Sequence, residues 1–405
     1  MAGLVASSGL ALTGQSFANK PKYGGRLKIA CNGASSTSTL DPLRFNDNWI
    51  FLLASTVFNT LNHMKGDKLV SELATSWEMS KDKMSWIVDL RQGVLWHDGS
   101  EFTADDAVFS LKRHIDPSMG SVLSGPLALW KDVIKLGKYQ IKIILTAPDF
   151  ELPYVLHTPV LSMIKKGTTD WIHPVGTGAY AIKKHIPGVV FSAEKHRTYF
   201  KKDAGYFDAV RYIGMNDDTG RINALLSGTV DIIREVPFEL AGRVNRHSRY
   251  SIVRSDVGQY MINDMSVNYG WTKDHNARMA VKYATEREKI VNIVLNGYGS
   301  VGNDQPIYRT NPLFNADLQQ RVFDADKAQY YWKKTGIGTN SVKIHTGKVY
   351  AGAIKHCLVL QQSFAKAGIN LEIVRHSNDG FWSNIWGKKN FVTCLLYTSP
   401  SPRDS

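Results

Sequence analysis

A strand, a helix and a second strand follow one another within residues 209–233, and this unit constrains the fold more than any other feature. Residues 209–213 and 230–233 are short segments with one charged residue each among apolar ones, and residues 217–226, followed by Gly228, have the pattern of a capped helix. Two strands of one sheet that are joined through a crossover helix run parallel, because the crossover returns the chain to the edge from which it started. The sequence therefore predicts a parallel α/β sheet here.

The chain before this unit has the pattern of a small β-rich region. A helix predicted over residues 49–61 is followed by apolar residues that alternate with more polar ones, at positions 84 to 90 and again at 139 to 145. Such alternation is typical of half-buried strands. Between them, Thr103 with Asp106 three residues later predicts a capping box at the start of a helix over residues 104–114.

Helical patterns return after the unit. One or two helices are predicted over residues 274–295, one that Asp324 caps and Gly336 ends, and one over residues 353–367. The last is followed by a strand at residues 369–373. No repeat of fixed period and no low-complexity linker separates these regions. We therefore expect an α/β chain whose domains are built from interleaved segments.

One long segment resembles the signature of a known family. Residues 73–113 read LATSWEMSKDKMSWIVDLRQGVLWHDGSEFTADDAVFSLKR, which closely resembles the family-5 solute-binding proteins that deliver peptides, nickel chelates and other solutes to ABC importers. Shorter matches span most of the chain: GGRLKIA, PVGTGAY, LLSGTVDI, ARMAVKYATEREKIV and DADKAQYYWKKTGIG. The first motif is long and specific, and together the motifs make the resemblance strong.

The resemblance implies an α/β fold of two hinged lobes, the periplasmic binding protein type II or Venus-flytrap fold, with an extra β-rich subdomain inserted into lobe I. Mapped onto this pattern, lobe I takes residues 25–57 and 184–256, the inserted subdomain takes residues 58–183, and lobe II takes residues 257–393. In the family the chain finally returns to lobe I. We expect this C-terminal part to be missing here.

Both ends of the chain have unusual patterns. The first 18 residues carry no charge and end in Ser16-Phe17-Ala18, which has the form of a signal-peptidase site, so residues 1–18 are expected to be a signal-peptide remnant. Residues 394–404 read CLLYTSPSPRD and resemble the translation of a sequencing-library adapter. We expect residues 394–405 to be a non-native tail.

Ligand-binding positions follow from the resemblance alone. They lie in the loop after Asp41, after Asp231, at the crossing between lobes and in the late part of lobe II. On these grounds the expected ligand-binding residues are Asn46, Asn48, Arg234, Glu235, Gln259, Tyr260, Lys348 and Trp386. Peptide-binding relatives hold the amino group of the ligand with an Asp that would follow Thr393, and this chain offers no match, so a non-peptide solute stays open.

The function that the resemblance implies is that of the periplasmic substrate-binding component of an ABC importer. It would capture a small solute, an oligopeptide first of all, in a cleft between the lobes and deliver it to the inner-membrane permease. We expect a monomer that uses no cofactor, no metal and no nucleic acid. The alternatives are a sensory protein that presents its ligand to a membrane receptor, and import of a nickel chelate, an opine or an oligosaccharide.

No pattern in the sequence favours an enzyme. A GxSxG elbow, an HExxH helix and a Walker-type loop are all absent from the sequence. His97 and Asp98 fit a tight turn, and Gly176 and Gly178 fit a β-turn, because no helix with a Lys-Ser/Thr pair follows them. A secreted hydrolase would need an activated nucleophile that these motifs do not supply. We therefore expect no catalytic residues.

The charge and the cysteines add little. The net charge of +13 could favour nucleic acid, but the basic residues come as scattered pairs such as Lys165 and Lys166, without a stripe of interleaved aromatics. We interpret them as a solvated surface. The three cysteines form no CxxC motif, and the sequence leaves open whether Cys31 and Cys357 pair.

Overall fold

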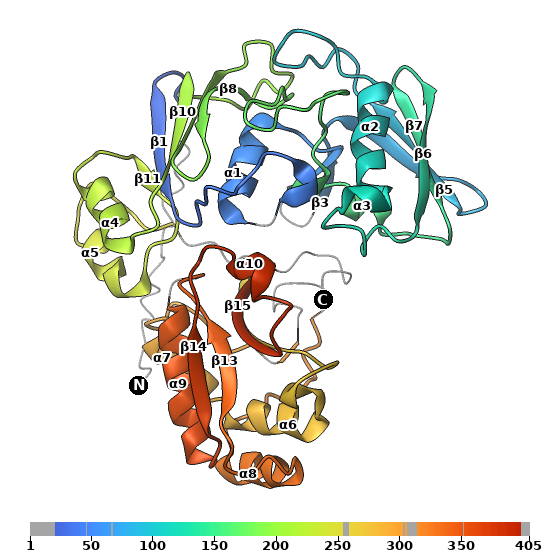
Figure 1. Cartoon of the computed structure of the whole chain (residues 1–405). Helices are drawn as coiled ribbons and strands as arrows, with labels where there is room; N and C mark the ends of the chain where they lie inside the picture. The colour runs from blue at the N-terminus through green and yellow to red at the C-terminus, as the bar shows by residue number, and fades with distance from the viewer. Residues whose placement is uncertain are drawn as a thin grey trace, which may run out of the picture.

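The computed structural model of the chain describes residues 21–45, 47–65, 68–253, 259–302, 304–305, 314–350 and 352–397. Figure 1 shows these residues as two lobes, with lobe I above lobe II. The predicted signal-peptide remnant lies outside the described residues. The predicted passage of the chain from lobe I to lobe II near Val257 and residues 398–405 of the predicted tail also lie outside the described residues.

Lobe I is built on a five-stranded sheet in the order β11-β1-β10-β9-β8. The strands are β1 (Arg26–Cys31), β8 (Tyr180–Ile186), β9 (Val190–Lys195), β10 (Ala209–Gly214) and β11 (Ile232–Ile233). Strand β1 pairs in parallel with β10 and β11, and β9 pairs antiparallel with β10 and β8. Helix α4 (Asp218–Leu226), N-capped by Asp217, crosses from β10 to β11. The predicted strand–helix–strand unit is therefore confirmed.

Helices cover both faces of this sheet, because successive side chains of a strand point to opposite sides. Ile29 packs against the core formed with α1 (Asn48–Val57), in which Trp49 is fully buried. Its neighbour Ala30 packs instead with Ile222 and Val244, which come from α4 and α5 (Ala241–Asn245). Two short 3-10 helices, η1 (Pro42–Arg44) and η4 (Phe238–Leu240), complete lobe I.

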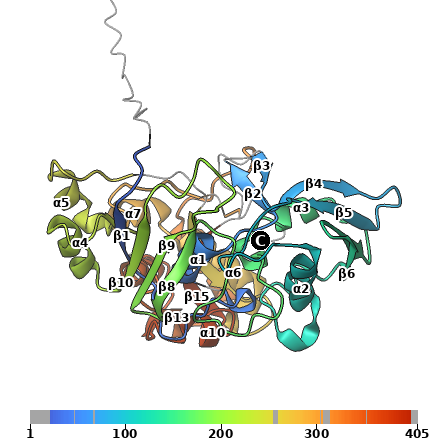
Figure 2. The ribbon, with the colours of Figure 1, turned by 90° about the horizontal axis from the view of Figure 1, so that it is seen from above.

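The inserted subdomain carries an antiparallel sheet in the order β4-β5-β7-β6 and a hairpin of β2 and β3. Its elements are β2 (Asn62–Lys65), β3 (Lys68–Ser71), β4 (Ala74–Met79), β5 (Ser85–Leu90), α2 (Ala104–Ile115), η2 (Pro117–Met119), β6 (Trp130–Gly137), β7 (Gln140–Leu145), α3 (Leu152–Val155) and η3 (Pro159–Leu161). The predicted capping box at the start of α2 is confirmed, since the Asp106 carboxylate accepts the Thr103 backbone N–H at 2.9 Å. Seen from above in Figure 2, this subdomain and the pair α4 and α5 lie at opposite ends of lobe I.

Lobe II is built on a four-stranded sheet in the order β12-β15-β13-β14. Its elements are β12 (Gln259–Met265), η5 (Trp271–Lys273), α6 (His275–Ala284), α7 (Arg287–Ile293), α8 (Ala325–Lys334), β13 (Val342–Thr346), α9 (Ala353–Lys366), β14 (Leu371–Arg375), α10 (Phe381–Asn384) and β15 (Phe391–Tyr397). Strand β13 is parallel to β14 and β15, and β12 is antiparallel to β15. Strand β15 continues to Tyr397, so regular structure does not stop at the tail boundary expected near Thr393.

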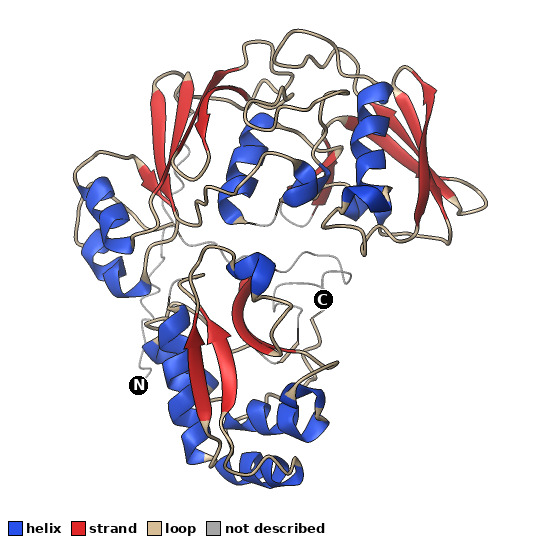
Figure 3. Cartoon of the chain, in the orientation of Figure 1, coloured by secondary structure: helices blue, strands red, loops and turns tan. Residues whose placement is uncertain are grey.

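Contacts between the lobes gather at η4. The Lys355 ammonium at the start of α9 lies 3.1 Å from a Glu239 carboxylate oxygen, and the rings of Phe238 and Tyr298 stack with their centroids 6.2 Å apart. Figure 3 shows that strands of the lobe I sheet and of the lobe II sheet have ends directed at the other lobe, whereas the strands of the inserted subdomain lie to one side. The fold therefore points the ends of two sheets at one another.

Candidate functional site

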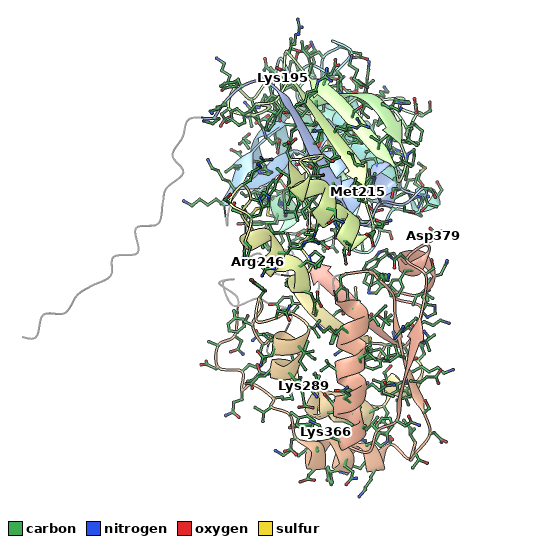
Figure 4. The ribbon with its side chains drawn as sticks, turned by 90° about the vertical axis from the view of Figure 1, so that its left-hand side faces the viewer. Lys195, Met215, Arg246, Lys289, Lys366 and Asp379 are labelled. Carbon is green, nitrogen blue, oxygen red and sulfur yellow. The ribbon has the colours of Figure 1, made fainter. Side chains whose placement is uncertain are left out.

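The parallel strands of lobe I end on the side that faces lobe II. Strand β10 starts beside the end of β9, since Ala209 pairs with Glu194. In Figure 4, Lys195 lies at the end of lobe I far from lobe II, and Met215, which follows β10, lies near lobe II. The carboxyl ends of parallel strands are where α/β sheets bind ligands. This edge is therefore the first candidate surface.

The parallel strands of lobe II end toward lobe I in the same way. Strands β13 and β14 run in register from Val342 and Leu371 to Thr346 and Arg375. In Figure 4, Lys366 at the end of α9 lies far from lobe I, whereas Asp379, just after β14, lies close to it. The two sets of strand ends form one candidate site with a half on each lobe.

Arg221 ties the strand ends of lobe I together. This α4 side chain is buried, with 1% of its surface exposed. Its Nη1 donates to the Met215 carbonyl at 2.8 Å and its Nη2 lies 3.4 Å from the Glu235 carbonyl, so one guanidinium joins the ends of β10 and β11. The Asp218 carboxylate, one turn earlier in α4, forms an ion pair with the Arg221 guanidinium. The sequence analysis did not find Arg221.

Arg234 and Glu235, both expected to bind ligand, follow β11 at this edge. The Arg234 backbone N–H donates to the Ala30 carbonyl of β1 at 2.9 Å. Glu235 has a positive φ of 57°, and its carboxylate accepts a hydrogen bond from the Asn32 side-chain amide at 2.6 Å. The structure therefore brings these two predicted residues together with Asn32, which the prediction missed.

The start of α1 lies close to this group. Asp47 caps the helix by accepting the Ile50 N–H at 2.7 Å, and Ser38 donates its hydroxyl hydrogen to the same carboxylate at 2.9 Å. Burial raises the pKa of Asp47, and the hydrogen bonds and the Arg234 charge oppose that rise. Asn48, the next predicted residue, is the first residue of α1. Asn46 lies outside the described residues.

The predicted residues of lobe II are spread over three elements. Gln259 is the first residue of β12, but its side chain lies outside the described part of the chain. The Tyr260 ring borders Gly302, where an added Cβ would lie 3.5 Å away. Lys348 is exposed, and its carbonyl accepts the Asn378 amide at 2.9 Å. Trp386 is 38% exposed and packs edge-on against Trp382.

A run of ring contacts, missed by the sequence analysis, leads from the lobe II sheet to Trp386. His345 Nδ1 and His376 Nε2 are hydrogen-bonded at 2.8 Å. The chain of neighbouring rings continues through Phe381 and Trp382 to Trp386. Burial lowers the pKa of His345 to about 4, and the His376 and Lys389 charges lower it further. The His345 imidazole is therefore neutral at pH 7.

A second buried network lies at the start of α9. The Tyr350 hydroxyl is 2.8 Å from His356 Nδ1 and 2.5 Å from the Thr393 hydroxyl. Burial raises the pKa of Tyr350 and lowers that of His356 to about 4. These residues come from three separate segments, so no local pattern could have predicted their contact.

His97 has a structural role, as the sequence analysis interpreted it. Its Nδ1 accepts the Gly176 N–H at 3.2 Å, and its Nε2 lies 3.0 Å from the Gly178 carbonyl. A Cβ at Gly176 would lie 1.9 Å from the Val57 carbonyl oxygen, so only glycine fits there. The loop that holds Gly176 and Gly178 therefore packs directly on the end of α1, and His97 holds it there by two hydrogen bonds.

The described residues contain no group of three or more His, Cys, Asp or Glu side chains placed to hold a metal ion. A hollow of about 630 Å³ lies at the end of α2, between Arg113 and Trp171. It belongs to the inserted subdomain, whereas the charged and aromatic groups above lie at the strand ends. In the described part of the chain, no helix is both long and apolar enough to cross a membrane.

Comparison with known proteins completes the description of the site. Residues 68–405 match the model of the bacterial extracellular solute-binding proteins, family 5 middle. The glutathione-binding protein GsiB of Pectobacterium atrosepticum is 23% identical over 388 residues, which cover 93% of this chain and 75% of that protein.

Two solved structures share the fold. The periplasmic binding protein DppA from Helicobacter pylori in complex with the peptide STSA has a TM-score of 0.84 at 21% identity, covering 93% of this chain and 79% of that one. The binding protein AgaA from A. tumefaciens R10, in complex with agropinic acid, has a TM-score of 0.83 at 22% identity, covering 94% and 79%. The predicted two-lobed periplasmic binding protein type II fold is confirmed.

Proposed function

The chain belongs to family 5 of the bacterial extracellular solute-binding proteins of ABC importers, and we propose that it captures a small solute between its lobes and delivers it to a permease. The observation that carries the proposal is the opposition of two sets of strand ends, one charged around Arg221 and one aromatic around Trp386. Ligands of α/β sheets bind at such carboxyl ends. In this proposal the protein acts as a monomer in the periplasm.

Capture works by closure of the lobes. A solute held between them favours the closed form only by the difference between its affinities for the closed and open forms. Contacts from both lobes supply that difference, because a solute bound to one lobe alone would bind the open form equally well. Contacts at η4, such as the 3.1 Å pair of Lys355 and Glu239, lie where the lobes already meet.

The solute proposed first is an oligopeptide. Glutathione, the ligand in the name of the P. atrosepticum relative, and the peptide held by the H. pylori protein support this choice. An opine, a nickel chelate or an oligosaccharide is the alternative; the agropinic acid complex supports the opine, and a neighbour in complex with Ni(L-His) supports the nickel chelate. The residues proposed to contact the solute are Asn46, Asn48, Arg234, Glu235, Gln259, Tyr260, Lys348 and Trp386.

The protein performs no chemistry on the solute in this proposal. Cys31 and Cys357 are buried, and burial raises the pKa of each thiol to about 12. A thiol in that state is a poor nucleophile at neutral pH. His356, in contact with Tyr350 and Thr393, is fully enclosed, so a solute does not reach it.

Thermal-shift screening tests the proposal. The panel contains tri- and tetrapeptides, glutathione, opines, a nickel–histidine chelate and oligosaccharides. A solute present at about 100 times its Kd stabilises the folded protein by about 2.7 kcal/mol, which is a shift of several degrees. Trp386→Ala should reduce the shift, whereas Tyr330→Ala, an exposed position on α8, should not. If no solute raises the melting temperature, or if one is turned over, the proposal fails.

A further inference from the structure

The Glu235 carboxylate has unused capacity to accept hydrogen bonds. An ionised carboxylate accepts at about four positions. Oε2 takes the Asn32 amide at 2.6 Å, whereas Oε1 lies 3.8 Å from Arg234 Nη2, which is too long for a hydrogen bond. With 22% of the side chain exposed, Oε1 has no hydrogen-bond donor among the described residues and can be approached from solvent.

The backbone holds this carboxylate in one place. Glu235 has a φ of 57°, in the left-handed region that a residue with a Cβ adopts at a cost of about 1–3 kcal/mol. Arg221 at its carbonyl and Asn32 at its carboxylate fix the residue from two sides. A group fixed in advance loses little conformational freedom when a ligand binds to it.

Asn32 adds a second acceptor beside the carboxylate. Because its Nδ2 donates to Glu235, its Oδ1 points elsewhere; the reverse orientation would set two acceptors against each other. This Oδ1 is buried and has no hydrogen-bond partner among the described residues. A buried acceptor without a donor costs about 1–3 kcal/mol, which a donor arriving at this edge would recover.

Counted over the described residues, the charges around Glu235 leave an excess of negative charge. Asp47, Asp218 and Glu235 are three carboxylates, and Arg221 and Arg234 are two guanidiniums, which gives 2 − 3 = −1. Arg221 is already bound to Asp218 and to two carbonyls. A group with one positive charge would therefore balance the cluster, whereas an anion would have to compete with carboxylates for the guanidiniums.

We propose that Glu235, positioned by Asn32 and Arg221, is the receptor on lobe I for a positively charged group of the solute. The solute class is then an amine or guanidine compound, such as a peptide with a free amino terminus, whose N–H groups reach Oε1 of Glu235. This inference rests on the proposed capture of a solute between the lobes and names the chemistry that selects it. Capture of an anion by Arg234 is the competing outcome.

Isothermal titration with trialanine and N-acetyl-trialanine tests the inference on the unaltered protein. Acetylation removes the positive charge and keeps the peptide backbone, and it should weaken binding about 30-fold, as expected for one charge-assisted hydrogen-bond site. Equal affinities for the two peptides, or tighter binding of the acetylated one, would overturn the inference. If neither these peptides nor any solute of the thermal-shift panel binds, the capture function itself fails.

A variant pair provides the second readout. Glu235→Gln should weaken trialanine about 30-fold and leave N-acetyl-trialanine unchanged, because the two changes remove the same interaction. Glu239→Gln, four residues along in η4 and paired with Lys355 rather than facing the strand ends, should bind both peptides like the parent. Equal losses for both peptides in Glu235→Gln would assign the residue to folding and reject the role in selection.

Discussion

Both lobes present the ends of parallel strands to the candidate site, but the side chains at these ends differ. In lobe I the ends of the parallel strands are joined by charged groups, chiefly the buried Arg221 and the carboxylate of Glu235. In lobe II the corresponding ends carry a run of rings that starts at His345 and His376 and leads to Trp386, beside the charged residues Arg375 and Lys348. One half of the site offers charged groups fixed by hydrogen bonds, and the other offers aromatic rings beside exposed charged groups.

The difference assigns different tasks to the lobes. Charged groups at a partly buried edge select a solute by its charge and fix its orientation. Aromatic rings supply contact area whatever the charge of the solute, at a small cost in conformational freedom. We infer that the charged groups of lobe I select the solute, and that the aromatic rings of lobe II supply contact area to the solute when the lobes close.

The largest effect is expected from Arg221→Ala. The change leaves the Met215 and Glu235 carbonyls without their donor, separates Asp218 from its partner, and empties a buried volume. The free energy of unfolding should fall by about 3 kcal/mol in urea titrations. Arg211→Ala, an exposed position on β10, should change it by less than about 0.5 kcal/mol. Equal losses of unfolding free energy in the two variants would show that Arg221 does not stabilise the strand ends of lobe I more than an exposed arginine does.

The pH dependence of lobe II should come next. The pKa of His356 is lowered by burial from 6.5 to about 4. Between these values the unfolded chain binds a proton that the folded chain does not, so stability is full above pH 6.5 and falls as the pH is lowered to about 4. His356→Asn should reduce the slope of unfolding free energy against pH by about 1.4 kcal/mol per unit in this window.

A second histidine of lobe II should contribute to the same slope. His345→Asn removes a second histidine whose pKa is lowered to about 4, and its effect on the slope should be similar in size. His345 and His356 lie in separate networks, so the two reductions should add in the double variant. An unchanged slope in both single variants would show that the fold of lobe II does not hold these two histidines neutral.

Tyr350→Phe should have a smaller effect. It removes one hydroxyl and leaves both His356 and Thr393 without that partner inside lobe II. A loss of about 1.5 kcal/mol in unfolding free energy is expected. The matched change Tyr330→Phe affects a ring that is 55% exposed on α8 and should cost less than about 0.5 kcal/mol. If Tyr350→Phe is also neutral, the network contributes nothing to the stability of lobe II.

The smallest effect is expected where the lobes already touch. Lys355 and Glu239 have side chains that are 39% and 45% exposed, and pairs of this kind contribute about 0–1 kcal/mol. Lys355→Ala should therefore lower the free energy of unfolding by about 0.5 kcal/mol or less, and by less still at high salt. A loss of 2 kcal/mol would mean that charge at η4, rather than at the strand ends, dominates the junction of the lobes.

Local patterns predicted most of the fold. The capping box at Thr103, the cap at Asp324 and the unit from β10 to β11 depend on residues close in sequence, and each is present. The helix predicted over residues 49–61 ends earlier, at Val57. The Gly178 N–H, far along the chain, donates to the Val57 carbonyl at 2.7 Å. The periodicity of apolar residues in the helix does not reveal a contact at this sequence separation, so the helix end could not be predicted.

The candidate site could be predicted only in part. Arg234 and Glu235 were expected from the resemblance to the family, and they lie at the strand ends. Arg221 and Asn32 were missed, because the first has the sequence pattern of an ordinary helix residue and the second that of a polar residue after a strand. Their roles come from the tertiary approach of β1, β10 and α4. A role for Trp386, Lys348 or Tyr260 in binding stays a prediction.

The central claim, capture of a solute by closure of the two lobes, is tested most directly by the distance between the lobes. Double electron–electron resonance measures this distance between spin labels on Lys184→Cys and Lys333→Cys. Both positions are exposed, one on β8 and one on α8, and the native cysteines are buried, which keeps them from reacting with the label. Saturation with a solute found by titration should shift the distance distribution to shorter values and narrow it. An unchanged distribution with the solute bound would contradict capture by closure of the two lobes.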